Sequence, residues 1–309
     1  MKKTVAAMLT AVLCMSVMAG CGSKAEEAAP TEETVAESTG TEESGQAEEA
    51  GSEEASEETE APAEAADNAE GQDAEAAAVS EALADGVLNV GTNAEFPPFE
   101  YVNDSGEPDG FDIALIKAIG EKLGVEVQVD NMEFASLVSS IGTKIDVSIA
   151  GMTVTEERLN TVDFSDSYYE AIQNVLVLEG SEIAGADDLT GKAIGVQLGT
   201  TGDFIAEEIE GATVSQYNKG VDAVNDLVNG RLDCVIIDKN PALVFESKFE
   251  GKVIALDGGQ FNFETENYAI AMPKGDTVLA EQINGALQAL KDDGTFDALV
   301  AEYIEESNQ

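Results

Sequence analysis

From about residue 85 to the end of the chain, short β-branched runs alternate with stretches of helical periodicity. The strand-like runs are Val87–Gly91, Val125–Val129, Ala193–Val196, Cys234–Ile237 and Tyr268–Met272, and the helix-like stretches are 111–119, 200–209, 219–229 and 277–291. This alternation predicts an α/β fold with mostly parallel sheets, whose binding sites lie at the carboxyl ends of strands. About 225 residues are enough for one large domain or two lobes.

The stretch 146–158 carries the most informative side chain. It opens as a short apolar strand, breaks at Gly151 and then presents Arg158, one of only two arginines in a chain with 62 acidic residues. A guanidinium beside free backbone N–H groups and the Thr153 hydroxyl forms a planar receptor for a carboxylate, because its fork matches two oxygens at once. The alternative is a surface ion pair between Arg158 and one of the two glutamates that precede it.

Composition argues against several function classes. The chain has no histidine, which removes Ser-His and Cys-His nucleophilic pairs and the usual zinc ligand sets. Its formal net charge of -47 argues against nucleic-acid binding, because phosphate contacts need a basic surface. No Gly-rich phosphate-binding loop is present. We therefore expect the protein to bind no metal, cofactor or nucleic acid. The composition does not exclude a catalytic acid–base pair of Asp or Glu.

The first 20 residues have the pattern of a secretory signal. Their apolar segment, Val5–Met18, is too short and wrongly flanked for a stable membrane span. The segment 17–21 resembles the lipobox of bacterial lipoproteins. That resemblance implies cleavage before Cys21 and its acylation, for example with palmitate, which would hold the protein on the extracytoplasmic face of the cell membrane. An ordinary signal peptide and a freely secreted product are the alternative.

A low-complexity segment follows Cys21 and runs to about Ser80. It consists mainly of Glu, Ala, Ser, Thr and Gly and has almost no large apolar residues. Such a segment buries too little surface to offset its ordering entropy, so we expect disorder. Between a lipid anchor and a globular domain at 81–309, it is best interpreted as a tether. An acidic interaction tail is the alternative.

Four stretches of the globular region resemble the polar-amino-acid family, family 3, of ABC-transporter substrate-binding proteins: Gly91–Tyr101, Gly110–Leu115, Ile149–Arg158 with Asp163–Tyr169, and Gly195–Thr201. The resemblance covers essentially the whole globular region. It implies a two-lobed periplasmic-binding-protein-like fold of type II, with two hinge strands and closure on a ligand between the lobes. Lobe 1 would comprise about 86–172 and 264–309, lobe 2 would comprise about 173–263, and the protein would be a monomer.

The resemblance also implies where the common part of an amino acid would bind. Arg158, Thr153 and the backbone from Ala150 through Gly151 to Thr153 would hold the α-carboxylate. Thr201 would add backbone and hydroxyl donors from the other lobe, since a helix N-terminus suits an anion. We expect these groups to act together.

The remaining implied site residues concern the α-ammonium and the side chain of the ligand. Asp238 would take the α-ammonium, and its alternative role is a helix cap. Recognition of the side chain would fall to Asn93, Phe96, Phe134 and Gln197, with a core position as the alternative for Phe96. The neutral Asn93 argues for a neutral polar ligand such as glutamine, whereas the stretch 196–201 looks like that of arginine and lysine binders.

The function implied is capture of a free polar amino acid and its delivery to an ABC permease. The protein would then not be an enzyme. A few proteins that resemble this fold are cyclohexadienyl or arogenate dehydratases, and that is the alternative: Arg158 would hold a substrate carboxylate and a nearby Glu would act as general acid. A sensor module for a separate membrane partner is a third reading.

Overall fold

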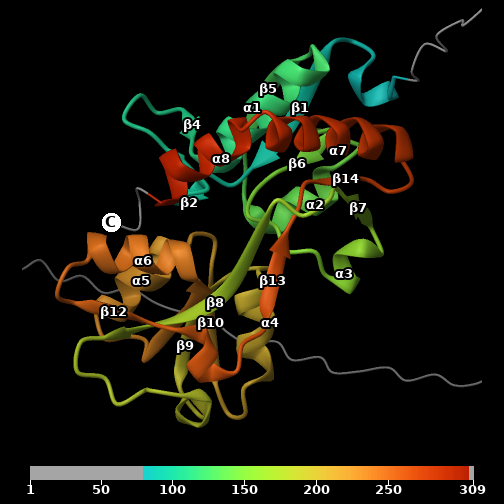
Figure 1. Cartoon of the computed structure of the whole chain (residues 1–309). Helices are drawn as coiled ribbons and strands as arrows, with labels where there is room; N and C mark the ends of the chain where they lie inside the picture. Colours follow the sequence, from blue (N-terminus) through green and yellow to red (C-terminus); the bar gives the residue numbers. More distant parts are fainter. Residues whose placement is uncertain (1–78, 306–309) are drawn as a thin grey trace, which may run out of the picture. The chain divides into compact units, whose positions relative to one another are not determined.

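The computed structural model describes residues 79–305 (Figure 1). The predicted signal segment, Cys21 and the predicted linker up to residue 78 lie outside the described residues. These residues form two large β-sheets and one small sheet. The small sheet has three strands: β2 (Glu95–Phe96), β3 (Glu100–Val102) and β4 (Pro108–Asp109). No helix among residues 79–305 is long and apolar enough to cross a membrane.

The first sheet, with its helices, forms what we call lobe 1. Its strand order is β5-β1-β6-β14-β7, in which β1 pairs in parallel with β5 and β6, and β14 pairs antiparallel with β6 and β7. The strands are β1 (Val87–Thr92), β5 (Glu126–Asn131), β6 (Val147–Ser148), β7 (Val162–Phe164) and β14 (Ala271–Pro273). The helices are α1 (Phe111–Leu123), α2 (Leu137–Ser140), α3 (Glu156–Leu159), α7 (Thr277–Asp292) and α8 (Thr295–Leu299).

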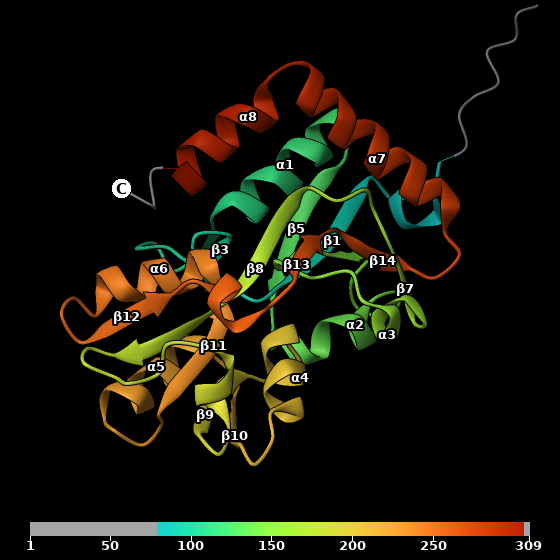
Figure 2. The same ribbon diagram turned by 60° about the horizontal axis from the view of Figure 1, so that its bottom comes forward.

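Helix α1 illustrates how the sequence builds lobe 1. Gly110, at φ 120°, precedes it, and a Cβ at this position would lie 2.4 Å from the Phe99 carbonyl oxygen, so the close approach requires glycine. Gly124 ends the helix in the left-handed conformation that helix C-termini favour. The fully buried Phe111 and Ile119 belong to its apolar face, and α1 packs beside α7 and α8 (Figure 2).

The second sheet, with its helices, forms what we call lobe 2. Its order is β10-β9-β11-β8-β12; β9, β10 and β11 run parallel, and β8 pairs antiparallel with β11 and β12. The strands are β8 (Tyr169–Leu178), β9 (Ala193–Gln197), β10 (Thr213–Tyr217), β11 (Cys234–Asp238) and β12 (Val253–Leu256). The helices are α4 (Thr201–Glu208), α5 (Gly220–Val228) and α6 (Lys239–Lys248). Every residue of β11 is buried, as expected for a covered, mostly parallel sheet.

Two segments carry the chain between the sheets. Strand β8 begins at Tyr169, and β13 (Thr265–Tyr268) pairs antiparallel with it, with Tyr268 opposite Tyr169. The expected continuous strand Tyr268–Met272 is wrong, because the chain leaves β13 at Tyr268 and enters β14 of the other sheet at Ala271. Between these strands, the Ile270 N–H donates to Ser165 Oγ at 2.9 Å, so a side chain replaces a ladder partner.

The start of the described part adds to lobe 1. Ser80, which the sequence places at the end of the linker, is buried and donates from Oγ to Asp276 Oδ2 at 2.7 Å. Its backbone N–H donates to Gln282 Oε1 at 3.2 Å, and its hydroxyl caps a short 3-10 turn at Glu81–Leu83. The ordered packing of lobe 1 thus includes Ser80.

Candidate functional site

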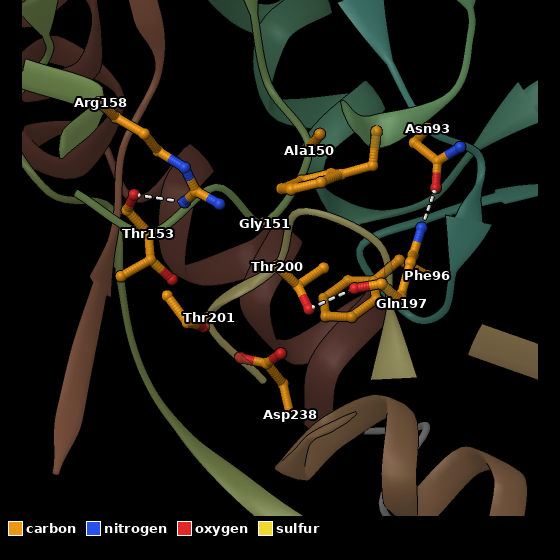
Figure 3. A pocket seen from close by; sticks show the side chains of 11 residues that line it. Asn93, Phe96, Ala150, Gly151, Thr153, Arg158, Gln197, Thr200, Thr201 and Asp238 are labelled. Carbon is orange, nitrogen blue, oxygen red and sulfur yellow. Dashed lines mark hydrogen bonds between the residues drawn. The ribbon is translucent and has the colours of Figure 1, made fainter. Parts of the chain in front are cut away.

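A pocket lies between the two lobes, at the carboxyl ends of four strands. Asn93 follows β1, Ala150 follows β6, Gln197 ends β9 and Asp238 ends β11. The lining residues are Asn93, Phe96, Phe134, Ala150, Gly151, Thr153, Arg158, Gln197, Thr200, Thr201 and Asp238 (Figure 3). The structure thus brings all ten residues selected from the sequence into one pocket and adds Thr200. Their roles toward a ligand stay a prediction.

The walls of this pocket nearly meet. The cavity measures about 10 Å³, which is about the space that one water molecule needs. Groups from opposite lobes touch across it: Gln197 Nε2 donates to Asn93 Oδ1 at 2.8 Å, and Arg158 Nη2 donates to the Gly199 carbonyl at 3.0 Å. The facing side chains therefore have to shift apart before a molecule as large as an amino acid fits between them.

Arg158 sits on α3 and is 7% exposed. Its Nη1 donates to the Thr153 carbonyl at 2.6 Å, and its guanidinium lies 5.4 Å from the centre of the Phe134 ring. Burial lowers the pKa of Arg158, while Glu266 is the largest influence that raises it. The surface ion-pair alternative is wrong, since within residues 79–305 Arg158 forms no salt bridge with a carboxylate. Two of its N–H donors are engaged, which leaves donors for a ligand.

Gly151 forms the turn after β6 with a positive φ of 52°. Its backbone N–H donates to Asp112 Oδ2 at 2.8 Å, so this amide is already engaged and is not the free carboxylate donor expected from the sequence. The space beside it is tight as well, because a Cβ on Gly151 would lie 2.9 Å from Phe96 Cε1. Glycine is therefore required for both conformation and space.

Asp112 belongs to a buried pair of acidic side chains next to this turn. It accepts a hydrogen bond from the Tyr168 hydroxyl at 2.8 Å, and Glu100 lies beside it, completely buried. Neither Glu100 carboxyl oxygen has a hydrogen-bond partner among the described residues outside this pair. Burial raises the pKa of Asp112 to about 6, and burial followed by the charge of Asp112 raises that of Glu100 well above its ordinary range.

Asp238 ends β11 at the position just before α6 and is 6% exposed. It makes no side-chain capping bond to the helix, so the helix-cap alternative is wrong. Instead Asp238 Oδ1 accepts from the Tyr268 hydroxyl at 2.5 Å. Burial and then the charge of Glu266 raise the pKa of Asp238. A cation placed here would restore favourable pairing to a buried carboxylate.

Glu266 is a functional candidate that the sequence reasoning missed. It lies on β13, and its carboxylate accepts from Thr153 Oγ1 at 2.5 Å, Thr201 Oγ1 at 2.7 Å and Gln173 Nε2 at 3.1 Å. Strand alternation could have indicated it, because Glu266 shares a strand face with Tyr268, but the predicted strand began at Tyr268, two residues after Glu266. Residues 79–305 contain no cluster of three acidic, His or Cys side chains arranged to hold a metal.

The opposite end of the pocket is lined by carboxamides (Figure 3). Asn93 Nδ2 donates to the Met132 carbonyl at 2.8 Å, and Gln197 Nε2 donates to the Asn218 carbonyl at 3.1 Å as well as to Asn93. Glu95 is close by but engaged, since Lys219 Nζ from lobe 2 lies 2.5 Å from its Oε1. This end therefore presents neutral polar groups.

Phe96 and Phe134 complete the apolar part of the lining. Phe96 is 7% exposed, and its ring stacks on Phe99 with centroids 6.0 Å apart. Phe96 is therefore part of the core, as its alternative reading proposed, and it also lines the pocket. Phe134 lies toward Arg158 rather than only toward the carboxamide end. Aromatic faces of this kind suit the methylene groups of a polar side chain.

Comparison with known proteins agrees with this geometry. Residues 88–306 match the model of the family described as bacterial extracellular solute-binding proteins, family 3. The L-arginine-binding protein of Pseudomonas aeruginosa is 34% identical over 230 residues, which cover 72% of this chain and 89% of that protein. The glutamine-binding protein of an ABC transporter of Bacillus subtilis is 35% identical over 208 residues, covering 65% of this chain and 75% of that protein.

A solved structure shows the same architecture. An ancestral arginine-binding protein bound to arginine is 40% identical and superimposes with a TM-score of 0.67, covering 71% of this chain and 98% of that chain. The predicted two-lobed fold of type II is thereby confirmed, and the curated relatives are binding proteins rather than enzymes. The chain belongs to family 3 of the bacterial extracellular solute-binding proteins.

Proposed function

We propose that this protein captures a free polar amino acid outside the cytoplasm and delivers it to an ABC permease. The observation that carries the proposal is that Arg158 of lobe 1 and Asp238 of lobe 2 line one closed pocket. Two buried groups of opposite charge suit the carboxylate and the ammonium of a zwitterion, because each offsets the other's desolvation. The arginine-binding and glutamine-binding relatives support the class of ligand.

Closure couples this recognition to transport. The ligand would be held by lobe 1 through Arg158 and by lobe 2 through Asp238 and the backbone at the start of α4. Only contacts made to both lobes favour the closed form over the open one, so binding changes the shape that a permease meets. We propose that the protein acts as a monomer, since all residues that line the pocket come from one chain.

The side chain of the ligand would point toward Asn93 and Gln197. Their carboxamide oxygens accept hydrogen bonds, and the carboxylate of Glu95, which lines a neighbouring hollow together with Asn93, is engaged by Lys219. We therefore propose a polar side chain that carries N–H donors, as those of glutamine and arginine do. The dehydratase alternative has no comparable support, because the curated relatives are binding proteins.

The location rests on the beginning of the sequence. The apolar segment of the first 20 residues and the lipobox-like run before Cys21 support export and lipid anchoring at the extracytoplasmic face of the membrane. A tethered receptor there would meet both free amino acids and a membrane permease. Incorporation of radiolabelled palmitate, lost in Cys21→Ser, tests the anchor.

The ligand is tested first by a thermal-shift screen of the purified protein against the twenty amino acids, cystine and ornithine, since a ligand that binds only the folded form raises its stability. Arg158→Ala should then cost about 2 to 5 kcal/mol of binding free energy, which is about thirty-fold to several thousand-fold in Kd by calorimetry. Arg231→Ala is the matched control, because its guanidinium is exposed and paired with Asp226. Normal binding by Arg158→Ala would refute the assignment. Turnover of prephenate or arogenate would favour the dehydratase alternative.

A further inference from the structure

We propose that Glu100 and Asp112 share one proton in the folded protein at neutral pH, that Glu100 carries it, and that it holds the Gly151 turn in the shape the pocket needs. Glu100 is not among the residues that line the pocket, so it acts as a positioning residue. The effect on binding rests on the proposed function, whereas the proton belongs to the folded protein with or without a ligand.

The two carboxyl groups come from separate elements and meet in the interior of lobe 1. Glu100 begins β3, Asp112 lies in the first turn of α1, and both side chains are completely buried. The two groups are within hydrogen-bonding reach of one another. Among residues 79–305 neither belongs to a salt bridge, so no lysine or arginine of this part of the chain pairs with them.

The hydrogen bonds around this pair leave a place for one proton. Asp112 Oδ2 accepts from the Gly151 N–H and from the Tyr168 hydroxyl, each at 2.8 Å. Its Oδ1 and both carboxyl oxygens of Glu100 have no partner in the rest of the described chain. Buried oxygens without a partner are costly. A proton on Glu100, donated to Asp112 Oδ1, gives two of these three oxygens a partner.

Electrostatics decides how many protons the pair holds and where. Two carboxylates in contact and away from water cannot both ionise without a large cost, so one stays protonated. Asp112 accepts two hydrogen bonds that stabilise its ionised form, and burial raises its pKa only to about 6. Burial, then Asp112 and then Asp238 of lobe 2 raise the pKa of Glu100 well above its ordinary range. Burial and then Asp112 also raise the pKa of Tyr168, so its hydroxyl stays neutral.

The shared proton acts on the pocket through Gly151. This residue lines the pocket, its N–H donates to Asp112, and a Cβ on it would lie 2.9 Å from Phe96 Cε1. Phe96 in turn stacks on Phe99, which precedes Glu100 in the chain. Loss of the proton would set two like charges against each other directly behind this turn. Their repulsion would displace the wall of the pocket, so the proton keeps that wall in place.

Infrared spectroscopy of the full-length protein in deuterated water at neutral pH tests the proton without any ligand. The C=O stretch of a protonated carboxyl group is separate from the bands of a carboxylate. The difference between wild type and Glu100→Gln should show the loss of one protonated-carboxyl band. Glu107→Gln, an exposed glutamate in the loop after β3, should lose carboxylate bands only. A Glu100→Gln difference that also shows only lost carboxylate bands would overturn the proposal.

Calorimetry with L-arginine and L-glutamine at neutral pH tests the positioning role. In Glu100→Gln the amide still donates to Asp112 but cannot ionise, so this variant should bind within about two-fold of the wild type. Glu100→Leu has a similar size and no donor, and it should bind about ten-fold more weakly, the equivalent of one hydrogen bond. Equal affinity in the wild type and both variants would overturn the positioning role.

Two further outcomes have separate meanings. Ten-fold or greater weakening in Glu100→Gln would also overturn the positioning role, and this measurement decides the matter even when Glu100→Leu does not fold. A wild type that shows the protonated-carboxyl band but binds no amino acid would instead refute the proposed function and leave the shared proton standing.

Discussion

Replacing Asp112 by Asn should change how the free energy of unfolding depends on pH. Asp112 is completely buried beside Glu100 and accepts from the Gly151 N–H and the Tyr168 hydroxyl. An Asn oxygen can accept both bonds, so the variant keeps the local geometry and removes only the ionisable group. The comparison therefore isolates the cost of ionising a buried carboxyl group.

The sign and size follow from the pKa of Asp112, which burial raises from 3.8 to about 6. Between these pH values the folded protein binds more protons than the unfolded chain, so the free energy of unfolding falls as pH rises and levels off above pH 6. The shift corresponds to about 3 kcal/mol. Glu100 adds a contribution of the same sign, because burial and then the charge of Asp112 raise its pKa.

Urea unfolding at pH 4, 5, 6, 7 and 8 measures the effect. The stability of the wild type minus that of Asp112→Asn should fall by about 2.4 kcal/mol between pH 4 and pH 7, because part of the full change lies below pH 4. Asp130→Asn controls for the loss of one charge, since its side chain is exposed. A difference that stays constant across this range, or that grows with pH, would refute the reasoning that Asp112 ionises at a cost in the fold.

Two further substitutions test the two ends of the pocket. Asn93→Asp places a carboxylate at the carboxamide end and should raise the affinity for arginine relative to glutamine by about ten-fold or more, measured by calorimetry; an unchanged ratio would remove Asn93 from side-chain recognition. Gly151→Ala should cost about 1 to 3 kcal/mol in urea unfolding, because of its φ of 52° and the contact with Phe96. Gly86→Ala is the control for the effect of φ alone, because Gly86 has φ 83° and no atom lies near the position of an added Cβ. An equal loss of stability in both variants would show that the contact with Phe96 does not contribute.

Most of the pocket could be predicted because four stretches of the sequence resemble family 3, and the residues that this resemblance implies lie within a few residues of strand ends. Asn93, Gln197 and Asp238 each follow or end a short apolar run that is recognisable in the sequence, and parallel strands bring such ends to one edge. Arg158 stood out because arginine is rare in this chain. The hydrogen-bond partners of these groups could not be predicted from the sequence. Arg158 and the Gly199 carbonyl, for example, are 41 residues apart and lie on different lobes.

The sequence alone determined the α/β class, through its local periodicity, and it singled out Arg158, through residue type. Asp238 and the other site residues were implied by the resemblance of four stretches to family 3. The tertiary structure decided which hydrogen bonds these groups make. It paired the Gly151 amide with Asp112, brought Glu266 against Thr153 and Thr201, and closed the cavity to about 10 Å³. Such contacts join segments far apart in the chain, and their geometry exists only once both sheets have packed and the lobes have met.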